Sequence, residues 1–346
     1  MVITALYSLL QLAAGSDYSN PLIEQRADPW IHKSDDGFYY FIATAPEYDR
    51  LMLRRATTIQ DLASATDLEV WRKNGSGEMS HLIWAPELHQ IDGVWTILFA
   101  ASSSPEVFDV RMYLLMNEND DPFEGEWFVS GPIETPLDSF ALDATTFEHN
   151  GTRFLVWAQK PPGADGLPDP TINSCLFIAK WKGGSQLLSK PVELTRPELA
   201  WERQVYNVNE GPAVLIRHGK VFLTYSASAT DHNYSIGLLW ANETSDLLDE
   251  KSWTKLTDPV FKSSEKTSQY GPGHNSFTVS EDGKTDLLVY HSRDYKAIAG
   301  PALANPDRHT RIKPIRWTAN GMPDFGIPPG RHPASERGAG SNPEKD

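Results

Sequence analysis

The residues best suited to chemistry in this sequence are three carboxylates in apolar settings. Asp28 lies in the stretch ADPW, Asp143 in ALDA and Glu210 in VNEGP. A single Asp or Glu in such a setting more often caps a turn or faces water. Three that converge shift each other's pKa, as acid–base chemistry requires. Hydrolysis of a glycosidic bond needs such a set, because one carboxyl group acts as acid and another as base or nucleophile.

These carboxylates occupy matching places in a sequence pattern that occurs five times. Each copy combines a polar residue, a short apolar run, a turn containing Gly and an apolar-aromatic run, and the copies cover residues 23–44, 84–101, 142–158, 209–227 and 273–292. The copies start roughly 55 to 70 residues apart, the length of about one four-stranded blade. The pattern predicts an all-β, five-bladed propeller that brings five polar residues near one axis: Asp28, Glu87, Asp143, Glu210 and His274.

Residues 20–327 are expected to form this propeller as a single domain, because no linker interrupts them. Asx-Gly turn signals such as Asp36–Gly37 and Asp92–Gly93 separate the apolar-aromatic runs, and long amphipathic helical patterns are absent. Residues 328–346 are rich in Pro, Gly and charged side chains, which is typical of a disordered tail.

Bulk properties exclude several classes of function. The net charge of -15 argues against a nucleic-acid partner, whose phosphates attract Lys and Arg. The single cysteine, Cys175, excludes an intramolecular disulfide and a Cys-based zinc site, and its apolar surroundings indicate a buried, inert thiol. No segment is long and apolar enough to predict a membrane span. We therefore expect a protein without membrane or nucleic-acid partners, and a monomer.

The first 19 residues allow two interpretations. Residues 2–14 are apolar and are followed by Gly15 and Ser16, as in a signal peptide with a small-residue cleavage site. No Lys or Arg precedes this run, which suits an N-terminal extension packed on the domain instead. Four Asn-x-Ser/Thr sequons add modest support for secretion: Asn74, Asn150, Asn233 and Asn242. The sequence favours a secreted, extracellular protein.

The order of the motifs resembles glycoside hydrolase family 43, a family of five-bladed β-propellers. The resemblance runs from Asn20 to about Gly326 and rests on QRADPW, HLIWAPE, ALDAT, NEGP and GPGHNS, which begin at residues 25, 81, 141, 209 and 271. It implies an inverting reaction in which Asp28 is the general base, Glu210 the general acid, and Asp143 the residue that holds Glu210 and raises its pKa. It also implies that His274 faces a metal ion, usually calcium, in the central channel. No organic cofactor is expected.

The resemblance suggests further residues near the substrate. Trp84 could stack on a sugar ring or pack in the core, and Glu87 could hydrogen-bond the substrate or serve the structure. An arginine from the last blade is expected near the substrate or Asp143. His32 and Phe41 would line the pocket or, alternatively, pack around the first blade. The substrate-binding candidates are therefore Trp84, Glu87, Arg311 in preference to Arg293, His32 and Phe41.

The activity implied by the resemblance is the release of terminal α-L-arabinofuranosyl units from arabinan or arabinoxylan side chains of plant cell walls. The compact chain is similar to single-domain, arabinan-active members of the family. A β-xylosidase or an endo-1,5-α-L-arabinanase on the same scaffold remains open, since a fold does not determine its substrate. A carbohydrate-binding propeller without catalysis also remains open, although the three carboxylates argue against it. Serine-hydrolase, phosphate-loop and His-Glu-x-x-His motifs are absent.

Overall fold

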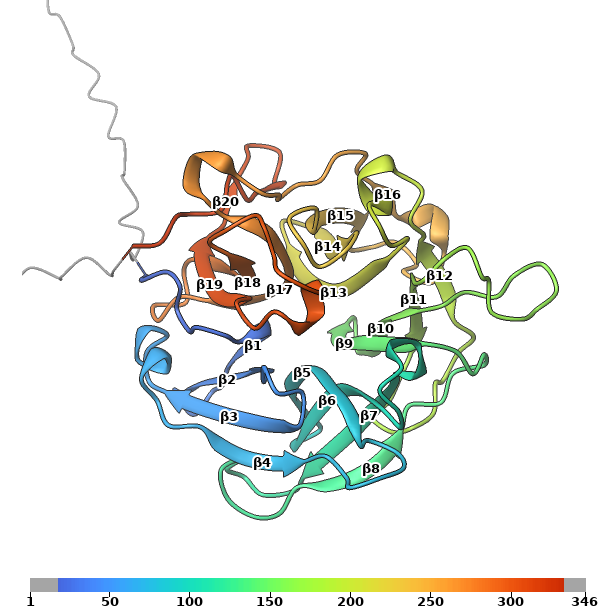
Figure 1. The fold of residues 1–346 in the computed structure, drawn as a ribbon, viewed down its shortest axis with the longest axis horizontal. Coiled ribbons are helices and arrows are strands. Elements are labelled where there is room, and N and C mark those ends of the chain that lie inside the picture. Colours follow the sequence, from blue (N-terminus) through green and yellow to red (C-terminus); the bar gives the residue numbers. More distant parts are fainter. Residues whose placement is uncertain (1–17, 333–346) are drawn as a thin grey trace, which may run out of the picture.

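Five β-sheets stand around a common axis in this protein, as the sequence pattern predicts (Figure 1). The structure is a computed structural model that describes residues 18–332. The apolar run at residues 2–14 and most of the predicted tail lie outside the described residues. The sheets form a five-bladed propeller in one domain, so the prediction of the fold is confirmed.

Each blade is an antiparallel meander that begins at the axis and ends at the rim. The strands of the first three blades are β1 Ala27–Lys33, β2 Tyr39–Thr44, β3 Arg50–Ala56 and β4 Leu68–Arg72; β5 His81–Ile91, β6 Val94–Ser102, β7 Arg111–Asn117 and β8 Phe128–Pro132; and β9 Ala141–His149, β10 Thr152–Gln159, β11 Cys175–Lys180 and β12 Val192–Thr195. Those of the last two are β13 Asn209–Arg217, β14 Lys220–Ala227, β15 Ser235–Asn242 and β16 Thr254–Lys255; and β17 Tyr270–Val279, β18 Asp286–Arg293 and β19 His309–Pro314.

Within residues 18–332, the connections carry a small hairpin and six single-turn 3-10 helices. These elements are β20 Arg316–Trp317, β21 Pro323–Asp324, η1 Gln60–Ala63, η2 Val107–Asp109, η3 Ala200–Arg203, η4 Glu250–Ser252, η5 Glu265–Thr267 and η6 Ala302–Ala304. Within residues 18–332 no helix has the length and apolar character needed to cross a membrane.

Apolar faces packed between neighbouring blades hold the ring together. All six residues of β2 (YYFIAT) are buried, because one face of the strand meets the second blade and the other meets the last blade. The apolar-aromatic runs of the sequence therefore form strands that are covered on both faces. Cys175 is buried in such a layer, as predicted.

The chain closes the ring by pairing its two ends. The last blade has three strands of its own, and the N-terminal segment adds to β19 through an Ile23–Thr310 bridge. A second bridge joins Asn20 to His332, with backbone N–H to carbonyl distances of 2.8 and 2.9 Å. Residues 328–332, which we assigned to the tail, therefore take part in this closure.

All five innermost strands carry a β-bulge at the same place. In each, three steps along the inner strand match two along its neighbour, starting from Ala27, Trp84, Leu142, Glu210 and Gly273. The next residue is left-handed in every case, with φ between 44° and 56°: Asp28, Ala85, Asp143, Gly211 and His274. Left-handed residues other than Gly cost about 1–3 kcal/mol each and cluster at functional sites. The five bulges thus mark one end of the channel as the site.

Candidate active site

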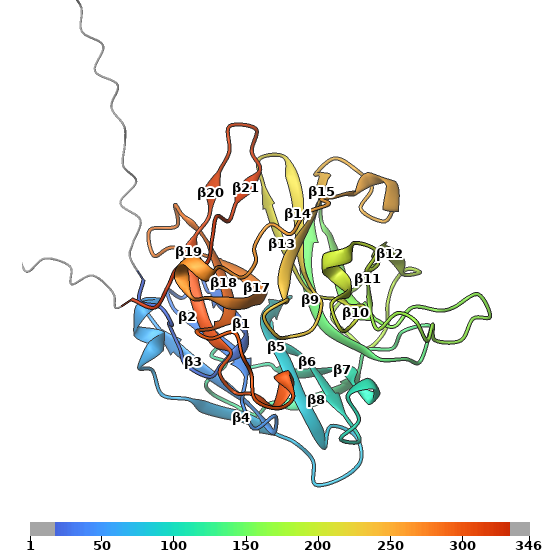
Figure 2. The same ribbon diagram turned by 45° about the horizontal axis from the view of Figure 1, so that its top comes forward.

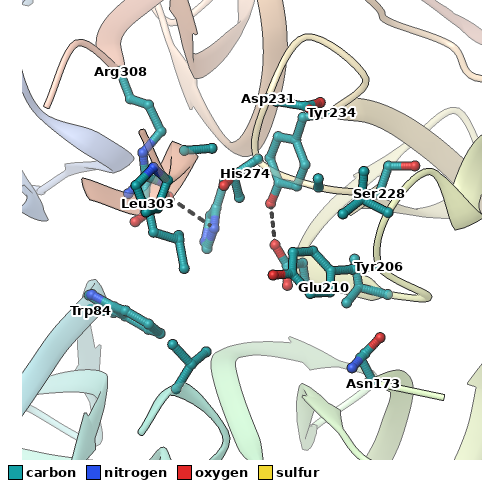
Figure 3. A pocket seen from close by; sticks show the side chains of 18 of the residues that line it. Trp84, Asn173, Tyr206, Glu210, Ser228, Asp231, Tyr234, His274, Leu303 and Arg308 are labelled. Atoms are coloured by element: carbon teal, nitrogen blue, oxygen red, sulfur yellow. Dashed lines mark hydrogen bonds and ion pairs between the residues drawn. The ribbon is translucent and has the colours of Figure 1, made fainter. Parts of the chain in front are cut away.

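A cavity of about 590 Å³ opens at the bulged ends of the innermost strands. Its polar lining includes the three carboxylates singled out in the sequence together with His274, Arg308 and Tyr234, while Trp84, Phe108, Tyr206 and Leu303 are among its apolar walls. Figure 3 shows Glu210, Tyr234, His274, Arg308 and Trp84 around this cavity. The loop between β18 and β19, orange-red in Figure 2, lies over the centre of the ring. The structure thus gathers Asp28, Asp143, Glu210 and His274 in one cavity, as predicted.

Asp28 is a buried carboxylate surrounded by cationic and neutral donors. One oxygen, Oδ1, lies 3.2 Å from Nη1 of Arg308 and 3.2 Å from Nδ1 of His274. The other accepts the hydroxyl of Thr44 at 2.7 Å. Burial alone would raise the pKa of Asp28, but the charge of Arg308, reinforced by His274, outweighs burial and holds this pKa well below its ordinary value. Asp28 is therefore ionised at neutral pH.

Arg308 is a site residue that the sequence reasoning missed. It is 5% exposed, lines the cavity and bonds Asp28. It immediately precedes β19, which runs parallel to the innermost strand β17 because both are antiparallel to β18. Residues just before the third strand of a blade therefore lie at the same face as the start of the first strand. This topological signal could have selected Arg308 instead of Arg311.

Asp143 lies beside both other carboxylates. Its Oδ2 accepts the backbone N–H of Gly211 at 2.9 Å and lies 3.9 Å from Nδ1 of His274. Burial, followed by the negative charges of Glu210 and Asp28, raises the pKa of Asp143 well above its ordinary value. Gly211 suits its position, because a Cβ there would lie 3.1 Å from the ring of His274 and would press against it.

Glu210 is the carboxyl group most suited to donate a proton. Burial raises the pKa of Glu210 to about 7, with the charge of Asp28 acting in the same direction and a hydrogen bond from Tyr234 and the charge of Arg308 opposing it. Asp143 and Glu210 interact strongly, so they titrate as a pair. The cavity thus presents an ionised Asp28 together with a Glu210 that is half-protonated near neutral pH.

Trp84 forms part of the cavity wall. This is the position that stacking on a sugar ring, one of its two predicted roles, would need. It is 8% exposed and packs edge-on against Tyr48, with ring centroids 5.6 Å apart. Its indole N–H has no hydrogen-bond partner among the described residues. Trp84 occupies the same bulge position in its blade that Glu210 occupies in the fourth.

Glu87 does not line the cavity, which corrects its assignment as a substrate contact. It stands two residues beyond Ala85, the bulge residue of its strand, and hydrogen-bonds His89 at 2.9 Å. The repeat in the sequence treats Glu87 as the equivalent of Asp28. In the structure the bulges show that Ala85 is the equivalent residue. Burial raises the pKa of Glu87 well above its ordinary value, with Asp143 adding to the shift. Glu87 is therefore a buried group outside the cavity lining.

Four other predicted substrate contacts also lie outside the cavity lining. Phe41 packs between the first and last blades, and His32 contacts Trp95 edge-on at 5.5 Å. Arg311 is fully buried and pairs with Asp294. Arg293 acts indirectly, because it donates to the carbonyls of Thr230 and Ala302, two residues of the cavity wall.

The residues around His274 do not by themselves form a calcium site. Calcium takes about six to eight oxygen ligands, and no group of three or more His, Cys, Asp or Glu side chains that could hold a metal occurs among residues 18–332. Nδ1 of His274 faces Asp28, and burial lowers the pKa of His274 against the opposing effect of Asp28. An ion at His274 would need water for most of its ligands.

Comparisons with known proteins agree with this geometry. An extracellular exo-α-(1→5)-L-arabinofuranosidase of Streptomyces avermitilis is 55% identical over 311 residues, which are 90% of this chain and 63% of the relative. α-L-Arabinofuranosidase 43 of Humicola insolens is 49% identical, over 94% of this chain and 68% of the relative. This chain thus spans slightly less than two thirds of the Streptomyces avermitilis protein.

Solved structures give the same result. The crystal structure of an α-L-arabinofuranosidase from Lactobacillus brevis superposes with a TM-score of 0.87 at 52% identity, covering 91% of this chain and 98% of that one. Residues 18–323 match the family described as glycosyl hydrolases family 43. A match of this extent, on a propeller whose bulges bring three carboxylates into one cavity, shows that the chain belongs to glycosyl hydrolases family 43.

Proposed function

We propose that this protein is an inverting, exo-acting α-L-arabinofuranosidase that releases terminal arabinofuranosyl units from arabinan or arabinoxylan side chains. The observation that carries the proposal is the contrast between Asp28, whose pKa is held well below its ordinary value, and Glu210, whose pKa is raised to about 7, in one cavity. Two carboxyl groups whose pKa values are pushed apart are the acid–base pair that glycoside hydrolysis needs. The arabinofuranosidase relatives support the choice of sugar.

Asp28 is the general base in the proposed reaction. It accepts a proton from a water molecule while the water oxygen attacks the anomeric carbon from the face opposite the leaving group. Arg308 keeps Asp28 ionised and orients it through Oδ1, and Thr44 fixes Oδ2. Attack from the opposite face inverts the configuration, and inverting enzymes leave about 6.5–9.5 Å between the two carboxyl groups for this water.

Glu210 is the general acid. It transfers its proton to the glycosidic oxygen as the bond from this oxygen to the anomeric carbon breaks, so the leaving sugar departs as an alcohol. Asp143 supports the acid in two ways. It fixes the backbone of the adjacent Gly211. The two carboxyl groups also disfavour a state in which both are ionised, since the charge of Glu210 raises the pKa of Asp143.

The shape of the cavity supports exo action. Residues 296–298 and 300–303 of the loop between β18 and β19 form one wall, and η2 with Phe108 forms another. A cavity enclosed by loops suits the end of a chain better than its middle. Trp84 would pack against the sugar ring in this cavity, since aromatic faces bind the apolar faces of sugars.

Hydrolysis assays separate the alternatives. We expect release of 4-nitrophenol from 4-nitrophenyl α-L-arabinofuranoside and of arabinose from arabino-oligosaccharides. Faster hydrolysis of 4-nitrophenyl β-D-xyloside would favour a β-xylosidase, and rapid shortening of debranched arabinan with little free arabinose would favour an endo-arabinanase. Binding of these glycans without any hydrolysis would identify a non-catalytic propeller.

The proposed site of action is outside the cell, on plant cell-wall polysaccharide. Support comes from the two Streptomyces relatives, both named extracellular, and from the sequons at Asn74, Asn150 and Asn242, which are exposed. Detection of the protein in culture medium during growth on arabinan tests this assignment.

A further inference from the structure

Tyr234 connects the acid to the base through one stack of side chains. Its hydroxyl donates to Oε1 of Glu210 at 2.7 Å, as Figure 3 shows. Its ring lies parallel to that of His291, with centroids 5.7 Å apart and an angle of 4°. Nδ1 of His291 in turn accepts the backbone N–H of Asp28 at 3.1 Å. Tyr234 is 1% exposed and lines the cavity, and the reaction proposed above assigns it no role.

The Tyr234 ring is tightly packed and has little room to move. A Cβ on Gly273 would lie 2.3 Å from Cδ1 and Cε1 of Tyr234, so only glycine leaves room for the ring. A Cβ on Gly271 would lie 2.2 Å from the backbone carbonyl oxygen of Asp231 and 3.7 Å from Cβ of Tyr234. Two glycines of the GPGHNS motif therefore place the Tyr234 hydroxyl, which explains part of this motif without reference to substrate.

The bond from Tyr234 makes the two oxygens of Glu210 chemically different. Oε1 is occupied as an acceptor, while no hydrogen bond from the described residues is recorded for Oε2. The other charged groups near Glu210 are Asp28 from β1, Asp143 from β9 and Arg308 ahead of β19. Burial, followed by the charges of Glu210, Asp143 and Asp28, raises the pKa of Tyr234 well above its ordinary value, so it remains a donor.

We propose that Tyr234 is a positioning residue that keeps the catalytic proton of Glu210 on Oε2, facing the glycosidic oxygen. The inference rests on the proposed role of Glu210 as general acid. In the protonated state, Oε1 accepts the Tyr234 hydroxyl and Oε2 carries the proton. As the glycosidic bond breaks, the proton moves from Oε2 to the leaving oxygen, and Glu210 becomes a carboxylate. Tyr234 keeps its own proton throughout and stabilises the charge that develops on Glu210.

The variant Tyr234→Phe removes the hydroxyl and keeps the ring stacked on His291. It should lower kcat on arabinobiose by about 10- to 100-fold, the size expected for a lost hydrogen bond to a charged group. On 4-nitrophenyl α-L-arabinofuranoside kcat should change far less, because 4-nitrophenolate departs with little protonation. The alkaline limb of the kcat–pH profile should move to higher pH, since the carboxylate form of Glu210 loses a donor.

Tyr225→Phe is the matched control. The Tyr225 hydroxyl donates to the buried Glu202 at the same distance of 2.7 Å, and Tyr225 is outside the cavity lining. This variant should lower thermal stability without changing the ratio of the two kcat values or the alkaline limb. Because the ratio does not depend on the fraction of folded enzyme, partial unfolding of either variant leaves the test valid.

The outcomes separate the two proposals. The ratio is measured on the aryl glycoside and disaccharide, arabinoside or xyloside, that the wild-type protein hydrolyses, so a wrong sugar does not affect it. Equal losses on both substrates, or an alkaline limb that stays or moves to lower pH in Tyr234→Phe, overturn the role of Tyr234 alone. A wild-type protein that hydrolyses neither pair of substrates overturns the proposed function and this inference with it.

Discussion

Replacing Arg308 with Met tests how the cavity sets its acid–base chemistry. The side chain keeps much of its volume but loses the charge that lies 3.2 Å from Asp28. Arg308 lowers the pKa of Asp28, of Asp143 and of Glu210. All three should therefore titrate at higher pH in the variant. Both limbs of the kcat–pH profile should move upward together.

The effect on stability follows from the same contact. At 3.2 Å and an effective dielectric constant of about 20, unit charges attract by about 5 kcal/mol. Removing one partner of a buried pair costs about 3–5 kcal/mol. Because the pKa of folded Asp28 is depressed, its contribution is present above the ordinary value of 3.8 and is lost as pH falls through the folded value. Because the unfolded chain titrates alike in both proteins, the stability difference should be largest above the folded pKa of Asp28 in the variant and should shrink as pH falls from that value through the depressed wild-type value.

The assays are the pH dependence of kcat on an arabinoside and denaturant unfolding at several pH values. Arg311→Met is the control, because Arg311 is also buried and paired with a carboxylate, Asp294, but lies outside the cavity lining. It should lower stability and leave both limbs in place. An Arg308→Met profile that does not move, or an Arg311→Met profile that moves in its stead, would refute the reasoning.

Three further results are expected. Asp28→Ala and Glu210→Ala should each lower kcat on arabino-oligosaccharides by about 10²–10⁴-fold, with a smaller loss for Glu210→Ala on 4-nitrophenyl arabinofuranoside; near-normal kcat in Asp28→Ala would show that another group is the base. If Asp143 is ionised while Glu210 is protonated, Asp143→Asn should move the alkaline limb to lower pH, because Glu210 then loses a negative neighbour, and an alkaline limb that stays or moves upward would contradict a tuning role. If a calcium ion resides in the channel, EDTA should lower the melting temperature, and an unchanged value after verified metal removal would exclude a stabilising ion.

Local sequence was sufficient for the repeat and for the residues within it. Apolar-aromatic runs separated by Asx-Gly turns can bury both faces only as central strands of stacked sheets, so five copies predict five blades. The same register selected Asp28, Asp143, Glu210 and His274, all of which line the cavity. It failed for Glu87, because the repeat was aligned two residues too late in the second blade. The strand pairing and the left-handed residue place Ala85, not Glu87, at the position of Asp28.

The sequence by itself determined the fold, the three carboxylates and the channel histidine, because these depend on periodicity and on residues within the repeat. Tertiary structure alone decided which arginine joins them. Arg308 and Arg311 are three residues apart, yet only Arg308, just before β19, reaches Asp28 across 280 positions of the chain. Tyr234 likewise lies just before the third strand of its blade, β15, and its ring position depends on glycines of the next blade. Such contacts depend on how the blades close around the axis, and closure is a property of the assembled ring that no local segment encodes.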